Sequence, residues 1–238
     1  MHRSTLTLAL AATLLLGAVS VVDGRSQRVS FRTDDGMTVA ATWYEPSTRP
    51  APAVVLVHML NRSRRDWESF ASRLAFSGIG ALAIDLRGHG ESPHPRSDPA
   101  NAEYAVMVRD ILSARRYLSS RGDVVPSRIG LVGASLGANL AAVAAADGAF
   151  TSLALLSPSL DYRGLRIEAA IKKYGKRPLL LVASDDDAYA RRSALELQKL
   201  NGAAELMVLN AAGHGTRMFD RAPDLSQALI EFLRRTVQ

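Results

Sequence analysis

The chain has 238 residues, of which 47% are hydrophobic and 22% charged, and this length and composition are typical of one globular α/β domain. Its net charge of +6 comes from 25 arginines and 4 lysines against 23 acidic residues, and the arginines are scattered without an interleaved aromatic stripe, which argues against nucleic-acid binding. The absence of cysteine excludes disulfides, a thiol nucleophile and lipid attachment through an N-terminal cysteine.

The first twenty residues have the pattern of a secretory signal peptide. A short basic start, Met1-His2-Arg3, precedes an apolar stretch over 6–19, which is too short to span a bilayer comfortably, and Ala18-Val19-Ser20 offers small residues to a signal peptidase. We therefore predict a signal peptide over 1–20 and one domain over 21–238, periplasmic or secreted, with no stable membrane span once the leader is removed. The alternative is an uncleaved leader that anchors the protein to a membrane.

The next segments predict a hairpin followed by alternating strands and helices. Two segments with alternating polarity, 27–32 and 37–44, flank an Asp35-Gly36 turn and predict two antiparallel strands. Beyond them, apolar runs typical of buried strands cover 52–58, 79–86, the run leading into Gly133, 151–157, 178–183 and 205–209. Helical segments cover 64–77, 102–119, 140–146, a short stretch near 165–174, 189–200 and 224–236.

This alternation predicts an α/β fold in which a mostly parallel sheet is covered by helices on both faces. In sheets of this kind, functional sites lie at the carboxyl ends of the strands. Candidate functional residues are therefore those that directly follow a predicted strand.

The segment Gly133-Ala134-Ser135-Leu136-Gly137 stands between a predicted strand and a predicted helix, the context in which G-x-S-x-G forms a nucleophile elbow. A serine at the tip of such a turn has strained backbone geometry, and glycines two residues to either side let strand and helix pass close together. The helix N-terminus behind the serine favours developing negative charge. Ser135 is therefore the predicted nucleophile.

A serine hydroxyl needs a base, and that base needs an acid to orient it. His214, in Gly213-His214-Gly215, follows the last predicted strand and is the predicted base. The acid is expected after the strand at 178–183, where Asp185, Asp186 and Asp187 stand in a row. Two of these three carboxylates are expected to be solvated or to cap a helix. No other ligand cluster is spaced to join them in a metal site.

With these motifs in this order, the sequence resembles α/β-hydrolases over nearly all of its predicted mature length. The strand ending at His58 resembles the strand that enters the family's oxyanion loop, and residues 85–92 resemble its D-x-R-G-x-G-x-S stretch. In the family the acid usually comes three residues after a small residue that ends its strand. Ser184 holds that place here, so the resemblance favours Asp187 over Asp186. Asp85, Arg87 and His89 are expected to satisfy loop backbone groups.

The resemblance also shows two departures. The family commonly has His-Gly where this chain has His58-Met59, so the oxyanion donors are predicted to be the backbone N–H groups of Leu136 and Leu60, with Met59 as the alternative to Leu60. About 20 residues separate the strands at 151–157 and 178–183, where many relatives insert a helical cap. The site is therefore expected to be open, as in small dienelactone-hydrolase-like enzymes. Because that subgroup often uses a cysteine nucleophile, its substrate is not carried over.

The predicted function is an exported serine hydrolase that cleaves a carboxylic ester of a small molecule, or a thioester or amide, without a cofactor or metal. The alternatives are a cofactor-free perhydrolase or lyase that uses the same triad of Ser135, His214 and Asp187, and a non-catalytic binding protein that has kept the fold.

Overall fold

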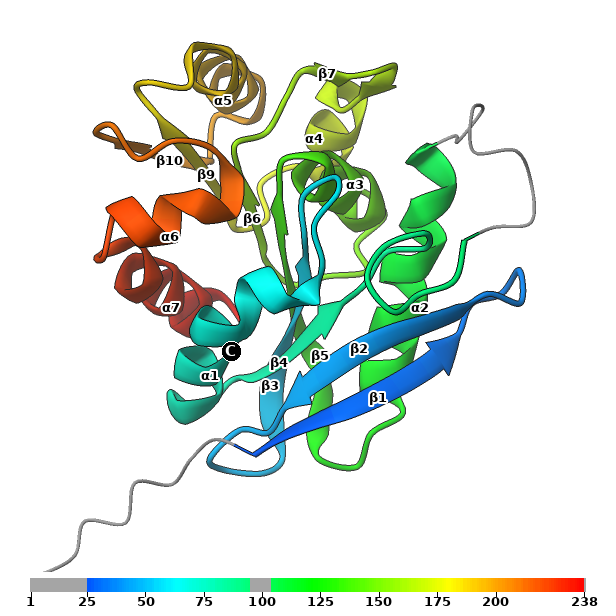
Figure 1. Ribbon diagram of the computed structural model, residues 1–238. Coiled ribbons are helices and arrows are strands. Elements are labelled where there is room, and N and C mark those ends of the chain that lie inside the picture. Colours follow the sequence, from blue (N-terminus) through cyan, green and yellow to red (C-terminus); the bar gives the residue numbers. More distant parts are fainter. Residues whose placement is uncertain (1–24, 95–103, 238) are drawn as a thin grey trace, which may run out of the picture.

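The computed structural model describes residues 25–94 and 104–237, which form a central eight-stranded sheet with helices on both sides (Figure 1). The predicted signal peptide over 1–20 and the first two residues of the helix predicted at 102–119 lie outside the described residues. The strands of the sheet are β1 (Ser26–Arg32), β2 (Thr38–Tyr44), β3 (Ala51–Val57), β4 (Gly80–Ile84), β5 (Val124–Ala134), β6 (Leu153–Leu156), β9 (Leu179–Ser184) and β10 (Glu205–Leu209).

The sheet has the order β1-β2-β4-β3-β5-β6-β9-β10. β1 and β2 form an antiparallel hairpin and β2 pairs antiparallel with β4, whereas the remaining neighbours are all parallel. The central strands are apolar along their length because both of their faces are buried. The predicted α/β class, with an N-terminal hairpin on a mostly parallel sheet, is therefore confirmed.

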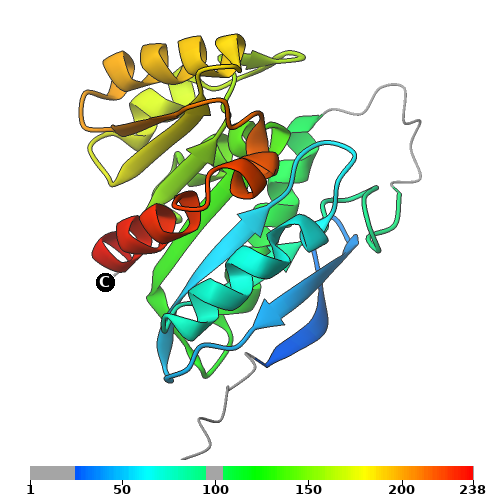
Figure 2. The ribbon, with the colours of Figure 1, turned by 60° about the vertical axis from the view of Figure 1, so that its left-hand side comes forward.

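Helices cover both faces of this sheet, as the two ribbon views show (Figures 1 and 2). One apolar core lies under α2 (Val108–Ser119), α3 (Leu136–Ala145), α4 (Glu168–Tyr174) and α5 (Ala188–Asn201). A second core lies on the opposite face under α1 (Glu68–Phe76), the short α6 (Met218–Arg221) and α7 (Leu225–Thr236). Short 3₁₀ turns, η1 (Arg64–Trp67), η3 (Tyr104–Met107) and η4 (Gly215–Arg217), precede α1, α2 and α6.

The helix predicted near 165–174 is wrong in its first part. A small antiparallel hairpin, β7 (Asp161–Tyr162) and β8 (Leu165–Arg166), comes first, and α4 begins only at Glu168. The turn between the strands has positive φ at Arg163 and Gly164, and the Asp161 carboxylate accepts the Gly164 N–H at 2.6 Å. A side-chain-closed turn of this kind competes with helix formation, and the aspartate and glycine three residues apart are its sequence signal.

Candidate active site

The carboxyl ends of four parallel strands bring the predicted site residues to one edge of the sheet. Ser135 directly follows β5, the three aspartates follow β9, and His214 follows β10 after a short loop. His58 directly follows β3, which pairs with β5. Side chains that are far apart in the sequence, from His58 to His214, therefore meet at this edge.

The elbow around Ser135 explains why both of its glycines are required. Ser135 has φ 53° and ψ −118°, a left-handed conformation that costs a non-glycine residue about 1–3 kcal/mol. A Cβ atom on Gly133 would collide with the Gly137 carbonyl oxygen, and one on Gly137 would lie 2.5 Å from the Val57 oxygen and 2.6 Å from the His58 oxygen. The two glycines thus allow α3 to begin against β5 and against the chain that leaves β3.

The side chains of Ser135, His214 and Asp187 form a continuous hydrogen-bonded chain. Ser135 Oγ lies 2.7 Å from His214 Nε2, and His214 Nδ1 lies 2.5 Å from Asp187 Oδ2. Because a carboxylate can only accept, Nδ1 carries the imidazole proton and Nε2 is left to accept from the serine hydroxyl. This is the protonation pattern that a base acting on Ser135 requires. Of the three aspartates in the row, it is Asp187, the predicted acid, that this geometry places against the imidazole.

Asp185 and Asp186 contact the loop that carries His214 rather than the imidazole. Asp185 Oδ1 accepts the Ala211 N–H at 2.7 Å, and Asp186 Oδ1 accepts the Gly213 N–H at 3.0 Å. The Ser184 hydroxyl also donates to Asp186, and these hydrogen bonds lower the pKa of that carboxyl. Both side chains are exposed, so they are solvated as expected, and in addition they hold the loop that carries His214. Their position in one row after a strand was the available signal.

Asp187 itself is held by a helix. Its Oδ1 accepts the Ala190 N–H at 3.2 Å and so caps α5, while Oδ2 faces His214. The two oxygens of one carboxylate thus have separate partners, which fixes the rotation of the group. Two serines hold the loop that carries His214, which we call the histidine loop. Ser157 Oγ accepts the Gly215 N–H at 2.9 Å, and Ser184 Oγ accepts the Ala212 N–H at 2.7 Å. The sequence marked Ser184 only as the small residue that ends its strand and gave no sign of the role of Ser157.

The two candidate oxyanion donors lie on segments that are in contact. Leu136 is the first residue of α3, and Gly137 touches the carbonyl oxygens of Val57 and His58 at the start of the loop that contains Leu60. The Met59 side chain is buried against the turn at Gly215, and Leu60 packs against the core on the opposite face of the sheet. The methionine that replaces the family's glycine thus fills space beneath the histidine loop.

His58 holds the start of this loop in place. It is fully buried, and its Nε2 accepts the Leu86 N–H at 3.0 Å, so Nδ1 carries the proton and donates to the Met59 carbonyl oxygen at 2.6 Å. Burial lowers the pKa of His58 to about 4. The imidazole is therefore neutral at physiological pH and fixes the peptide plane between Met59 and Leu60.

The D-x-R-G-x-G-x-S stretch takes part in a buried charged network. Asp85 satisfies loop backbone groups as expected, whereas the Arg87 side chain pairs with carboxylates instead. Asp85 is fully buried and accepts the backbone N–H groups of Arg64 at 2.7 Å and Glu91 at 2.8 Å, besides the Arg64 guanidinium. Arg87 donates to Asp110, which is also fully buried, and to Asp35. We call the buried residues Arg64, Asp85, Arg87 and Asp110 the buried charge network, and the exposed Asp35 pairs with it through Arg87. His89 Nδ1 lies 3.1 Å from the Arg87 carbonyl oxygen.

Neither a metal cluster nor a spanning helix occurs in the described part of the chain. Over residues 25–94 and 104–237, no three His, Asp or Glu side chains are grouped so that they could hold a metal ion. Within the same ranges, no helix has both the length and the apolarity needed to cross a bilayer.

Comparison with known sequences gives a family match and partial relatives. Residues 48–188 match the model of a family described as serine aminopeptidase, S33. An uncharacterised protein of Mycobacterium tuberculosis is 33% identical over 132 residues, which cover 55% of this chain and 44% of that protein. The chain thus spans less than half the length of this curated relative.

Solved structures with the same fold match most of the chain. A dienelactone hydrolase from Anabaena variabilis superposes with a TM-score of 0.76 at 18% identity, over 91% of this chain and 100% of that one. An esterase from Pyrococcus furiosus superposes with a TM-score of 0.71 at 19% identity, over 90% of this chain and 92% of that one. At these identities the similarity establishes the fold, which is the α/β-hydrolase fold.

Proposed function

Because this chain belongs to the serine aminopeptidase (S33) family, we propose that it is a serine hydrolase that cleaves a carboxylic ester through an acyl-enzyme on Ser135. The observation that carries the proposal is the hydrogen-bonded chain from Ser135 through His214 to Asp187, with distances of 2.7 and 2.5 Å. The esterase and the dienelactone hydrolase that share this fold act on esters according to their names, and they support the same reaction class.

Catalysis begins with the proton of the Ser135 hydroxyl. As Oγ attacks the acyl carbon, Nε2 of His214 takes this proton, and the negative charge of Asp187 stabilises the imidazolium that forms. The carbonyl oxygen becomes an oxyanion, and the backbone N–H groups of Leu136 and Leu60 are the proposed donors to it. His214 then returns the proton to the leaving oxygen. Water then attacks the acyl carbon as His214 takes its proton, and the carboxylic acid is released as that proton returns to Ser135 Oγ.

Esters and amides differ in what they demand of this machinery. An amine is a poorer leaving group than an alcohol or phenol, so amide cleavage depends more strongly on proton donation from His214. The name of the family favours an amide, namely the N-terminal peptide bond cleaved by an aminopeptidase, as the second candidate substrate.

A substrate panel on the purified protein tests the proposal. We expect hydrolysis of short p-nitrophenyl esters at a higher kcat/KM than that of aminoacyl p-nitroanilides. Ser135→Ala should reduce turnover of either class by several orders of magnitude, because it removes the nucleophile. Faster cleavage of the anilides would replace the ester proposal by the aminopeptidase one. Equal turnover by wild type and Ser135→Ala would refute both.

We also propose that the protein is exported, on the basis of the basic start, short apolar core and small residues of its first twenty positions. Mass spectrometry of protein recovered from the periplasm or medium tests this, and a mature N-terminus near residue 21 is expected. An intact Met1 on a cytoplasmic species would contradict export.

A further inference from the structure

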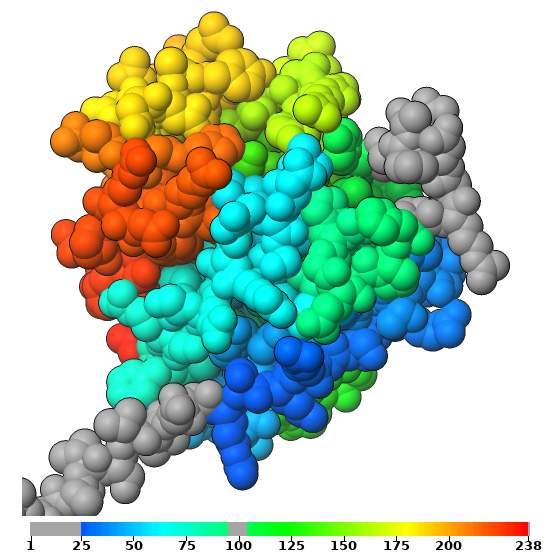
Figure 3. Space-filling model, viewed as in Figure 1, coloured from blue at the N-terminus to red at the C-terminus, as the bar shows by residue number. Residues whose placement is uncertain are grey.

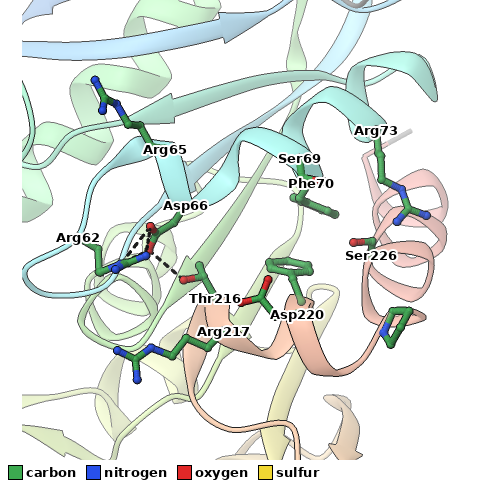
Figure 4. Close-up of a pocket in the computed structure, with 12 residues that line it drawn as sticks. Arg62, Arg65, Asp66, Ser69, Phe70, Arg73, Thr216, Arg217, Asp220 and Ser226 are labelled. Carbon is green, nitrogen blue, oxygen red and sulfur yellow. Dashed lines mark hydrogen bonds and ion pairs between the residues drawn. The ribbon is translucent and has the colours of Figure 1, made fainter.

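A groove lies beside the histidine loop but contains none of the triad residues. It has a volume of about 540 Å³ and runs between η1 and α1 on one side and η4, α6 and the start of α7 on the other (Figure 4). In the space-filling view these cyan and orange segments meet on the face shown (Figure 3). Two of its wall residues, Thr216 and Arg217, follow His214 by two and three positions. This volume falls within the range of small-molecule sites.

One part of the groove lining is aromatic. Phe70 of α1 and Phe219 of α6 stack with ring centroids 5.3 Å apart and planes inclined by 23°. The fully buried Trp67 packs against both rings, with centroids 6.0 Å from Phe70 and 5.8 Å from Phe219. Phe70 is only 2% exposed, so the half-buried Phe219 supplies the apolar surface of the groove, and the two buried rings hold it in place. Such a surface suits the apolar body of a ligand.

The charged lining of the groove is mostly positive. It includes four arginines but only two carboxylates, Asp66 and Asp220. Arg62 donates to both oxygens of Asp66, at 2.7 and 2.8 Å, and the Thr216 hydroxyl also donates to Asp66 at 3.0 Å. The nearby charge of Asp220 adds to the effect of Asp66 in raising the pKa of Arg62. Both carboxylates thus act on the same guanidinium.

Two other arginines keep their charge available. Among residues 25–94 and 104–237, no carboxylate lies within 4 Å of the guanidinium nitrogens of Arg73 or Arg217. Figure 4 shows Arg217 and Arg62 at one end of the groove and Arg73 at the other end beside α7, whereas Arg65 points away. A guanidinium presents several N–H donors in a planar fork that matches carboxylate and phosphate oxygens.

From this combination we propose that the groove binds an amphiphilic organic anion, with its apolar body against the Phe219 ring and its carboxylate or phosphate group on Arg217 or Arg73. The site is separate from Ser135 and goes beyond the proposed hydrolase activity. Since Thr216 and Arg217 form the turn after His214, an anion bound there also restrains that turn.

Isothermal titration of the full-length protein with three probes tests the site. Hexanoate and hexyl phosphate carry the two possible head groups, and hexanamide is a neutral molecule of similar size. We expect hexanoate or hexyl phosphate to bind with a Kd below about 1 mM, and the stronger of the two identifies the head group. Hexanamide should bind at least about tenfold more weakly. Equal binding of all three probes, or no binding of either anion, would overturn the proposal.

Variants locate the binding and separate it from the triad. Arg73→Gln/Arg217→Gln should raise the Kd of the anion at least about tenfold, because both exposed guanidinium partners are removed. Arg191→Gln/Arg192→Gln on α5 removes the same charge from exposed residues on the other side of the sheet and should leave the Kd unchanged. Ser135→Ala should also bind normally, whatever its effect on turnover. Anion binding that depends on Ser135 but not on Arg73 and Arg217 would refute a separate site.

Discussion

The triad and the buried charge network lie at the same edge of the sheet, yet they differ in how deeply their side chains are buried. Asp85 and Asp110 are fully buried, and each has several donors around it. In the triad, by contrast, the His214 side chain is 46% exposed and Ser135 keeps a strained backbone. The charges of the buried network thus stabilise the fold, whereas those of the triad remain available for chemistry. Substitutions in the triad should therefore lower turnover with little loss of stability, whereas substitutions in the buried charge network should lower stability with little loss of turnover.

The largest expected effect is on turnover in the triad. Asp187→Asn removes the negative charge and favours the wrong imidazole tautomer, and the same exchange in the Ser-His-Asp triad of a serine protease costs about 10⁴ in kcat. We expect a loss of that order in kcat for p-nitrophenyl esters, with little change in thermal stability.

Asp185→Asn and Asp186→Asn are the matched controls for this change. An asparagine oxygen can still accept the Ala211 or Gly213 N–H, so kcat should stay within about tenfold of wild type. If Asp186→Asn abolished turnover and Asp187→Asn were mild, the acid would be assigned to the wrong carboxylate.

The next effect concerns stability in the buried charge network. Asp110→Ala leaves Arg87 with only Asp35 as its carboxylate partner, and removing one member of a buried ion pair costs about 3–5 kcal/mol. We expect that loss in the free energy of unfolding by urea, with kcat of the folded fraction within about tenfold. Asp34→Ala, which breaks an exposed pair with Arg109, should cost less than about 1 kcal/mol. Equal losses for both variants would remove the distinction between the two regions.

A smaller effect is expected from the pH dependence of stability at His58. Its pKa is about 4 in the folded state and 6.5 in the unfolded state, so below pH 6.5 only the unfolded chain readily takes up the proton. Stability should therefore fall by about 2 kcal/mol between pH 7.5 and pH 5 through this residue.

His58→Asn cannot titrate and should lose less stability than wild type over the same pH interval. The neighbouring His89 and Asp85 are unchanged in the variant, so the difference between the two proteins isolates His58. Parallel pH profiles of unfolding for the two proteins would show that the buried imidazole is not kept neutral.

The smallest effect measures the strain of the elbow. Ser135→Gly and Ser135→Ala both remove the nucleophile, but only glycine adopts φ 53° without strain. We expect the free energy of unfolding of Ser135→Gly to be about 1 kcal/mol higher than that of Ser135→Ala. A less stable glycine variant would mean that the elbow stores no strain at this position.

Sequence patterns predicted those parts of the fold and site that depend on local order. Unbroken apolar runs predicted the buried strands, and the elbow glycines and the Gly213-His214-Gly215 loop marked Ser135 and His214 as candidate site residues, because each signal lies within a few residues. The partners of Asp185 and the role of Ser157 could not be predicted. They depend on where β6, β9 and β10 end relative to one another, and this register is set by packing across the sheet.

The central claim is that Ser135 is the nucleophile activated by His214. The most direct measurement is mass spectrometry of the protein after reaction with a fluorophosphonate, which forms a covalent bond with an activated serine. We predict one phosphonate per chain, attached to Ser135, and loss of labelling in His214→Ala, because Nε2 is the base that takes the hydroxyl proton. Labelling of another serine, or full labelling of Ser135 without His214, would contradict the account.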